Sequence, residues 1–175
     1  RAADTIRRLQ SFAATRMAEA PTLVNLSALV QEAVALARPR WKDEAEAHGV
    51  RVEVVTDLAE TAPVVGISPD LREMLINLIL NAVDAMPGGG RLSLTTRRRD
   101  DRVELLVKDT GTGMSEMVRR RLFDPFFTTR SPQRVGLGLS VVYGVVARHQ
   151  GTIEVDSREG EGTSFKILFP LAQGA

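Results

Sequence analysis

The chain of 175 residues contains no cysteine. This absence excludes structural disulfides, thiolate metal sites and cysteine nucleophiles together. Neither sign of charge dominates, because 23 lysines and arginines stand against 22 aspartates and glutamates and leave a net charge of +1. Aromatic residues make up only 5% of the sequence, and the arginine runs at 97–99 and 119–121 have few aromatic neighbours. A role in nucleic-acid binding is therefore disfavoured.

Long apolar runs are also missing. The sequence contains no stretch of about 18 apolar residues, the length needed to span a bilayer, and no recognisable signal peptide. We therefore expect a soluble domain in the cytoplasm. The hydrophobic share of 43% is enough for one core in a domain of ordinary size. Because the chain opens with Arg1 rather than Met, we expect a piece of a longer protein, whose remainder could be anchored in a membrane.

Periodicity and turn residues predict an alternation of helices and strands. Residues 1–20 carry apolar side chains three and four apart, which is typical of an amphipathic helix. Ser27 is predicted as the N-cap of the next helix, which Pro39 kinks or restarts. Further helices are expected at 69–85, 115–121 and 139–150, and strands at 50–57, 63–67, 91–98, 102–108, 152–157 and 163–169. The predicted fold is an α/β two-layer sandwich of a mixed β-sheet against helices over residues 22–172, with residues 1–20 as a helical appendage.

The helix at 69–85 carries a polar stripe opposite its apolar side. Five polar residues recur on it at steps of three and four: Asp70, Glu73, Asn77, Asn81 and Asp84. A solvated face is one interpretation. The other rests on Asn77 and Asn81, because asparagine weakens a helix interior and two amide oxygens one turn apart suit Mg²⁺.

Two glycine-bearing segments could approach a ligand. Asp109, Gly111 and Gly113 follow a predicted strand, where a carboxylate could accept a hydrogen bond from an exocyclic amine such as that of adenine; an ordinary turn is the alternative. The segment 136–139 opens a helix, whose N-terminus attracts phosphate, although a flexible hinge fits equally. The sequence contains neither the dinucleotide fingerprint nor a P-loop.

Several segments in order resemble one family, the ATP-binding domain shared by sensor histidine kinases, gyrase, the ninety-kilodalton heat-shock chaperones and mismatch-repair ATPases. Residues 73–85 (EMLINLILNAVDA) are similar to its N box, 109–113 (DTGTG) and 136–139 (GLGL) to its first two glycine boxes, and 123–130 (FDPFFTTR) to its F box. The stretch 160–163 (GEGT) resembles the final glycine box. The F box points to the histidine kinases, and Arg130 stands where relatives of the nitrogen-regulation type usually have lysine.

The resemblance implies that the domain binds ATP and Mg²⁺. It assigns the metal to Asn81 with Asn77 beside it, the adenine to Asp109 with Thr163 nearby, and the phosphates to Arg130 and the second glycine box. The implied catalytic residues are Asn77, Asn81 and Arg130. The full set of implied nucleotide-binding residues is Asn81, Asp109, Gly111, Gly113, Phe127, Thr129, Arg130, Gly136, Leu137, Gly138, Leu139 and Thr163.

Asn77 separates two kinds of chemistry within the resemblance. The hydrolysing branches have a glutamate there, whereas asparagine cannot act as a general base, which favours phosphate transfer to a protein. The family's acceptor histidine is followed by an acidic residue, and neither His48 nor His149 is. Both are interpreted as helix-end residues, so the acceptor is expected upstream, on a hairpin whose last part is residues 1–20. The implied partners are that hairpin, a second copy of the parent protein and a response regulator.

Two alternatives stay open at this point. A hydrolysing ATPase of the gyrase or chaperone branch would release phosphate rapidly. A binding-only relative is favoured by Arg134 and Val135, which replace a Gly-Thr pair before the second glycine box. Asp84 is a further departure, because it places a carboxylate where many relatives carry a cation toward the phosphates.

Overall fold

The computed structural model describes residues 19–124 and 138–173. Its helices and strands follow in chain order: β1 (Thr22–Val24), α2 (Leu26–Leu36), the π-helical η1 (Pro39–Glu44), α3 (Ala45–Ala47), β2 (Val52–Leu58), β3 (Val64–Gly66), α4 (Ser68–Asp84), β4 (Gly90–Arg99), β5 (Arg102–Asp109), α5 (Glu116–Arg121), α6 (Gly138–Arg148), β6 (Thr152–Arg158) and β7 (Gly162–Pro170). The appendage predicted at residues 1–20 lies almost wholly outside the described residues.

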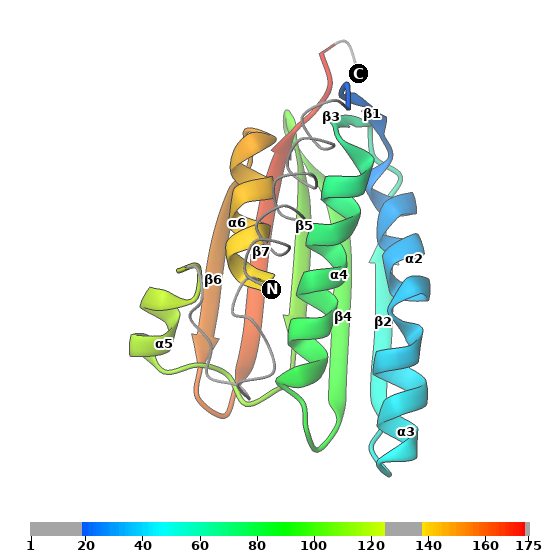
Figure 1. The fold of residues 1–175 in the computed structure, drawn as a ribbon. Helices are drawn as coiled ribbons and strands as arrows, with labels where there is room; N and C mark the ends of the chain where they lie inside the picture. The colour runs from blue at the N-terminus through cyan, green and yellow to red at the C-terminus, as the bar shows by residue number, and fades with distance from the viewer. Residues whose placement is uncertain (1–18, 125–137, 174–175) are drawn as a thin grey trace, which may run out of the picture.

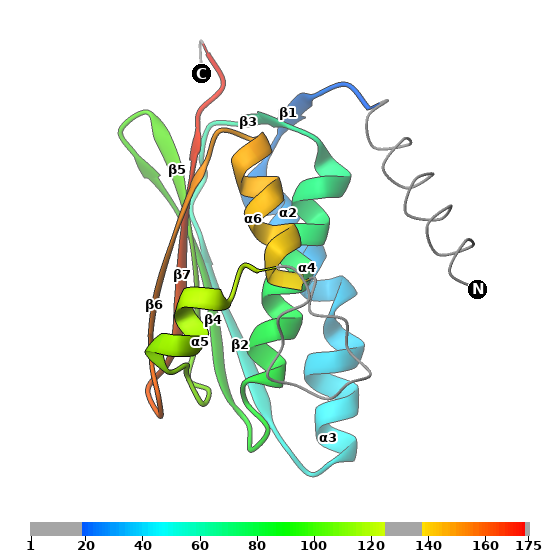
Figure 2. The same ribbon diagram turned by 60° about the vertical axis from the view of Figure 1, so that its left-hand side comes forward.

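Five strands form one mixed sheet in the order β2-β4-β5-β7-β6. The β2–β4 pair is parallel and the other three pairs are antiparallel, while β1 and β3 form a separate antiparallel ribbon. Helices α2, α4 and α6 cover one face of the sheet (Figure 1), and the turned view shows two layers with α5 beside β6 (Figure 2). The predicted two-layer α/β sandwich is therefore confirmed.

Strand alternation decides which side chains form the core. On β4 and β5 every second residue is buried against the helices, as Leu92, Leu94, Val103 and Leu105 show. The opposite face of the sheet carries cross-strand ion pairs: Arg91–Glu53, Arg97–Asp57, Arg99–Glu104 and Lys166–Glu154. A hydrogen bond to Glu154 raises the pKa of the Lys166 ammonium. The core therefore lies between the sheet and its helices, and the charged face of the sheet is directed outward.

The start of α2 differs from the prediction. Asn25 is the N-cap, because its Oδ1 accepts a hydrogen bond from the Ala28 N–H at 3.0 Å. Ser27 instead donates to the Ala59 carbonyl and lies 2.7 Å from Thr96 Oγ1 on β4. The hydroxyl of Ser27 fastens the helix to the sheet, through residues that are distant in the sequence.

The region after α2 follows the prediction that Pro39 interrupts the helix. The chain continues as η1, with Pro39 in its first turn, and then as α3 up to its C-cap His48. The π-helical segment carries Arg40 next to α4, where Arg40 Nη2 lies 2.9 Å from Asp84 Oδ1.

Within the described ranges no helix is both long and apolar enough to cross a membrane.

Candidate functional site

Helix α4 lies between α2 and α6 on the sheet (Figure 1). Its apolar side chains Leu71, Leu75 and Leu78 are buried, so the polar stripe occupies a different side of the helix. Asn77 and Asn81, in the middle of this stripe, are half-buried. The two asparagines therefore have the arrangement that helical periodicity predicts.

At each end of the stripe, an arginine from another segment donates a hydrogen bond to the carboxylate. Asp70 is only 2% exposed, and Arg148, the last residue of α6, donates to its Oδ2 at 3.4 Å. At the other end, Arg40 of η1 donates to Asp84 Oδ1 at 2.9 Å. The interpretation as a solvated face is thus wrong for Asp70, and a cation engages the carboxylate of Asp84.

The middle of the stripe faces the start of α6. A Cβ on Gly138, the first residue of α6, would lie 3.6 Å from Asn77 Oδ1. Leu139 follows Gly138 and packs, partly buried, against the core. The described end of the second glycine segment therefore borders the asparagine side of α4.

Asp109 ends β5 on the side of the sheet that faces the helices. Strand alternation brings it into line with Val103 and Val107, and it is 4% exposed. Its Oδ1 accepts a hydrogen bond from the Gly111 N–H at 2.8 Å, which fixes the orientation of the carboxyl group. Thr163 of β7 lies directly opposite Asp109 in the sheet register.

The loop after β5 requires glycine at two positions. A Cβ on Gly111 would lie 2.4 Å from the Ala85 carbonyl oxygen, and Gly113 combines a φ of +67° with a Cβ position 1.8 Å from the Arg158 carbonyl oxygen. No side chain fits at either place without moving the backbone. Residues 109–113 therefore form a loop that is packed closely against its neighbours.

Two further backbone hydrogen bonds join this loop to both sides of the site. The Thr112 N–H donates to the carbonyl of Ala85, just after α4, at 2.8 Å, and the Gly160 N–H donates to the Thr112 carbonyl at 2.7 Å. The end of α4, the loop after β5 and the turn between β6 and β7 are consequently held in one fixed arrangement around Asp109.

Ser157 is a site residue that the sequence analysis misses. It is buried on β6, where its Oγ accepts from the Met114 N–H at 2.9 Å and donates to the Gly162 carbonyl at 3.1 Å. Because that donation uses its one proton, the 2.8 Å contact with Thr163 Oγ1 is a hydrogen bond donated by Thr163. The available signal is a polar residue at a core-facing position of a strand, in step with Val155.

Five of the predicted nucleotide-binding residues lie outside the described residues: Phe127, Thr129, Arg130, Gly136 and Leu137. Arg134 and Val135, which favour a binding-only relative, lie outside them too. The structure brings together Asn77 and Gly138 on one side, and Asp109, Gly111, Gly113 and Thr163 on the other. Asn81 lies on α4 between these two groups, one turn after Asn77.

The two histidines are both at helix ends, as predicted. His48 is the C-cap of α3, and its Nδ1 lies 2.8 Å from the Glu44 carbonyl oxygen. His149 follows α6 and is buried, with its Nδ1 2.7 Å from the Val145 carbonyl oxygen. Both rings are engaged by the backbone of their own helical segment.

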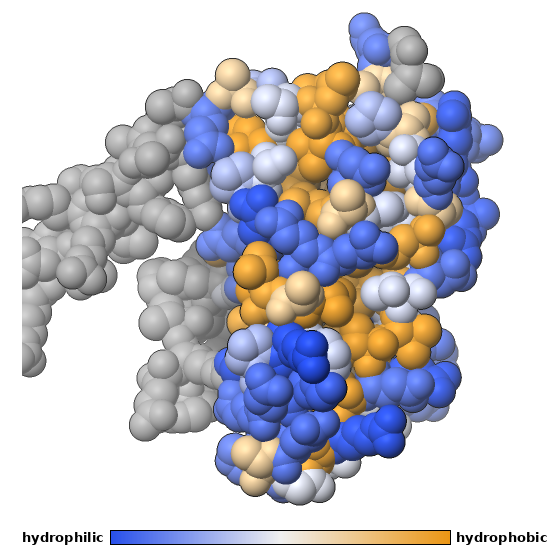
Figure 3. All heavy atoms as spheres, turned by 90° about the vertical axis from the view of Figure 1, so that its right-hand side faces the viewer, coloured by the Kyte–Doolittle hydropathy of each residue, from blue (hydrophilic) through white to orange (hydrophobic). Residues whose placement is uncertain are grey.

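A groove lies between η1, α3 and the edge strand β2. Trp41, Lys42, Glu46, Arg51 and residues 52–54 line it. It belongs to the side of the molecule shown in Figure 3, where apolar side chains are exposed between charged ones. Among the described residues no three His, Cys, Asp or Glu side chains gather as a metal site.

Comparison with known proteins defines the class of this domain. The family described as histidine kinase-, DNA gyrase B- and HSP90-like ATPases matches residues 66–173, and the chain belongs to it. The match contains α4, the loop after β5, α6 and the strands that carry Asp109 and Thr163. Within this family the chain is an ATP-binding catalytic domain of the sensor histidine kinase type.

Its relatives support this narrower assignment. Sporulation kinase E of Bacillus subtilis (strain 168) is 40% identical over 133 residues, which cover 75% of this chain and 18% of the kinase. Sensor kinase CckA of Brucella abortus (strain 2308) is 35% identical over 187 residues, covering 97% of this chain and 19% of that protein. The chain therefore spans about a fifth of the length of these curated relatives.

Solved structures show the same fold. The catalytic domain of histidine kinase ThkA has a TM-score of 0.73 at 27% identity, with 87% of this chain and 96% of that chain covered. Full-length ShkA in complex with AMPPNP has a TM-score of 0.75 at 29% identity, covering 90% of this chain and 32% of that one.

Proposed function

We propose that this domain binds Mg²⁺–ATP and transfers the γ-phosphate to a histidine outside this chain. The observation that carries the proposal is the position of Asn81 on α4. Along α4, Asn81 lies between Asn77, which Gly138 approaches closely, and the loop after β5, in which the Gly111 N–H orients Asp109. One site can thereby offer amide oxygens to a metal ion, backbone N–H groups of glycines to phosphates, and a carboxylate to the adenine base.

The adenine subsite is proposed at Asp109 and Thr163. Asp109 Oδ1 is held by the Gly111 N–H, and a carboxylate in this position can accept a hydrogen bond from the amino group of adenine. Because Thr163 donates its proton to Ser157, its oxygen can act as an acceptor at the same edge. Gly111 and Gly113 allow the loop to pack against the Ala85 and Arg158 carbonyls, which holds the loop beside Asp109 in a fixed position.

The residues present fit a magnesium ion at the other end of the site. Mg²⁺ prefers oxygen ligands and keeps waters and phosphate oxygens in its remaining positions, and the side-chain amide oxygens of Asn81 and Asn77 are neutral acceptors one turn apart. When bound, the metal neutralises charge on the phosphates. Arg130, together with Phe127, Thr129 and the second glycine segment, is proposed to contact the phosphate end.

Transfer is favoured over hydrolysis because Asn77 stands where a hydrolysing relative has its general base. An asparagine cannot remove a proton from water, so the contribution of the protein is to position the nucleotide and neutralise its charge. AMPPNP, an ATP analogue, is bound by the related full-length kinase ShkA, which supports a triphosphate as ligand here.

The proposed partners lie outside this chain. We propose a helical hairpin of the parent protein as the phosphate acceptor, with residues 1–20 as its last part, a second parent copy as dimer partner, and a response regulator as the next acceptor. The cytoplasm is the proposed compartment, since ATP and a response regulator are both met there. Membership of the histidine kinase family supports the response regulator as a partner.

A two-part experiment tests the proposal. Calorimetric titration of the chain with AMPPNP and Mg²⁺ is expected to show one site, and γ-labelled ATP is expected to label an added hairpin that carries the acceptor histidine. His48 and His149 should remain unlabelled. If no heat is released at millimolar ligand, the chain is a degenerate relative that docks partners without binding nucleotide. Rapid phosphate release without an acceptor would favour a hydrolysing ATPase.

A further inference from the structure

Asp84 poses an electrostatic problem for the proposed site. It lies on the polar stripe three residues after Asn81, so the two side chains are neighbours on one side of α4. Its side chain is only 14% exposed, and a carboxylate shielded from water repels a nearby anion more strongly than one in bulk solvent. A triphosphate next to Asn81 would meet this charge.

Arg40 is placed to cancel the charge of Asp84. The guanidinium donates through Nη2 to Asp84 Oδ1 at 2.9 Å, across 44 positions of sequence, and its own side chain is 29% exposed. A second carboxylate, that of Glu44, lies 2.8 Å from Arg40 Nε and is 53% exposed. Solvent therefore screens Glu44 more than Asp84.

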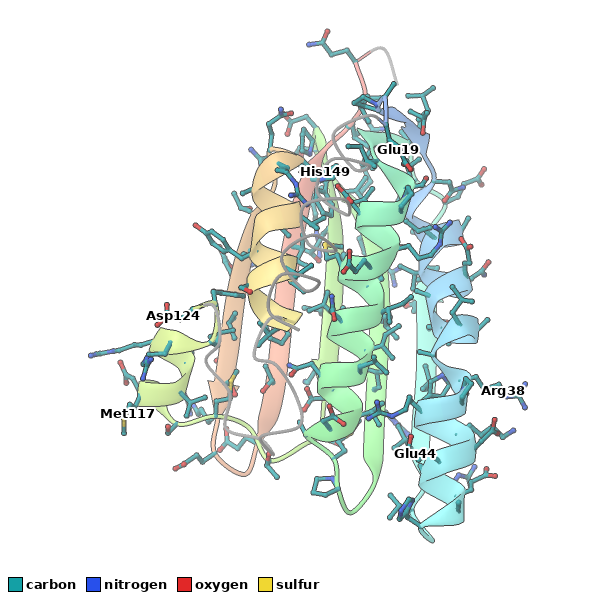
Figure 4. The ribbon with its side chains drawn as sticks, in the orientation of Figure 1. Glu19, Arg38, Glu44, Met117, Asp124 and His149 are labelled. Carbon is teal, nitrogen blue, oxygen red and sulfur yellow. The ribbon has the colours of Figure 1, made fainter. Side chains whose placement is uncertain are left out.

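The segment that carries Arg40 directs it toward α4. Arg40 and Glu44 are four residues apart in η1, and Figure 4 shows Glu44 on the side of η1 that faces α4, while Arg38 extends away from it into solvent. Arg38 and Arg40 are therefore two arginines two positions apart with opposite surroundings, and they form a matched pair for experiment.

We propose that Arg40 determines the specificity of this site for polyphosphates, by neutralising Asp84 at the metal end of the asparagine stripe. This inference rests on the proposed function. Arg40 acts as a positioning and charge-compensating residue through Asp84, so its effect scales with the charge of the ligand and depends on the Asp84 carboxylate.

The test is a series of calorimetric titrations with Mg²⁺–AMPPNP, Mg²⁺–ADP and adenosine. Arg40→Gln is expected to weaken AMPPNP binding about tenfold, ADP binding less, and adenosine binding by less than about twofold. Adding Asp84→Asn to Arg40→Gln removes the charge to be cancelled, and is expected to restore AMPPNP affinity to within about threefold of the original chain. Arg38→Gln, the control, should change none of the three affinities.

The outcomes separate this inference from the proposed function. If the original chain binds no AMPPNP, both fail. If it binds and Arg40→Gln weakens all three ligands equally, or none of them, the inference is overturned while the proposed function stands. Failure of Asp84→Asn to rescue AMPPNP binding would likewise overturn it. Thermal melting of each variant identifies any uniform loss that comes from unfolding.

Discussion

The backbone N–H of Ile67 donates a hydrogen bond to Nε2 of His149 at 3.1 Å. Because Nε2 accepts, the ring proton resides on Nδ1, which donates to the Val145 carbonyl at 2.7 Å. The neutral imidazole thus connects the end of α6 to the residue before α4. Its ring also meets Phe169 edge-on, with 6.2 Å between the ring centroids. A structural task accounts for His149 without any role as a phosphate acceptor.

Replacing this buried ring is expected to destabilise the domain. His149→Ala removes the acceptor of the Ile67 N–H and the contact with Phe169, and should lower the free energy of unfolding by roughly 2–4 kcal/mol. Urea denaturation measures it. His48→Ala, at an exposed helix end, serves as the control and should change stability by less than about 0.5 kcal/mol. Equal losses in both variants would contradict the connecting role of His149.

Local patterns in the sequence are enough to predict most of the fold. The period of three to four residues over 69–85 and the alternation at 102–108 reappear as α4 and β5, because both patterns follow from backbone geometry. The prediction of Ser27 as an N-cap is wrong, since its hydroxyl is engaged by Ala59 and Thr96. A tertiary contact overrides the local preference.

The candidate site is predictable only where a motif lies within one segment. Asn77, Asn81 and Asp109 belong to such motifs. The two arginines that bind the carboxylates at the ends of the stripe belong to no local motif. Arg40 lies 44 positions from Asp84, and Arg148 lies 78 positions from Asp70. Only the packing of η1 and α6 beside α4 brings these charges together, and no local pattern contains that information.

The glycines of the chain are expected to differ sharply in their tolerance of a methyl group. Gly113→Ala forces a side chain onto a φ of +67° and against the Arg158 carbonyl, so it should destabilise the domain by about 1–3 kcal/mol. Gly144, inside α6, has open space where a Cβ would stand, and Gly144→Ala should stabilise the domain by roughly 0.5–1 kcal/mol. Thermal melting compares the two. A destabilising Gly144→Ala would show that this side of α6 is packed against a neighbour.

The adenine assignment can be tested with a nearly isosteric change. Asp109→Asn keeps an oxygen for the Gly111 N–H but removes the charge, and should weaken ATP binding by about 1.5–3 kcal/mol, the range for a hydrogen bond to a charged group. Titration of AMPPNP measures the difference. Asp101→Asn, in the exposed turn between β4 and β5, is the control. An unchanged dissociation constant for Asp109→Asn would remove Asp109 from the adenine subsite.

Asn81 should be the residue that makes nucleotide binding depend on magnesium. Its amide oxygen is the proposed ligand, and Mg²⁺ holds few protein ligands besides phosphate and water, so losing one removes much of the benefit of the metal. Asn81→Ala is therefore expected to bind AMPPNP with Mg²⁺ no better than the original chain does in EDTA. The variant and the original chain should bind adenosine alike, because the adenine subsite is untouched.

Asn25→Ala is the matched control for the magnesium experiment. It removes a helix cap far from the asparagine stripe in sequence, which should cost about 1 kcal/mol of stability and leave the magnesium dependence intact. Comparing the two variants separates a loss of the metal ligand from a general loss of stability. If Asn81→Ala retains the full gain in affinity on adding Mg²⁺, the metal is held by other groups, and the asparagine stripe of α4 has some other purpose.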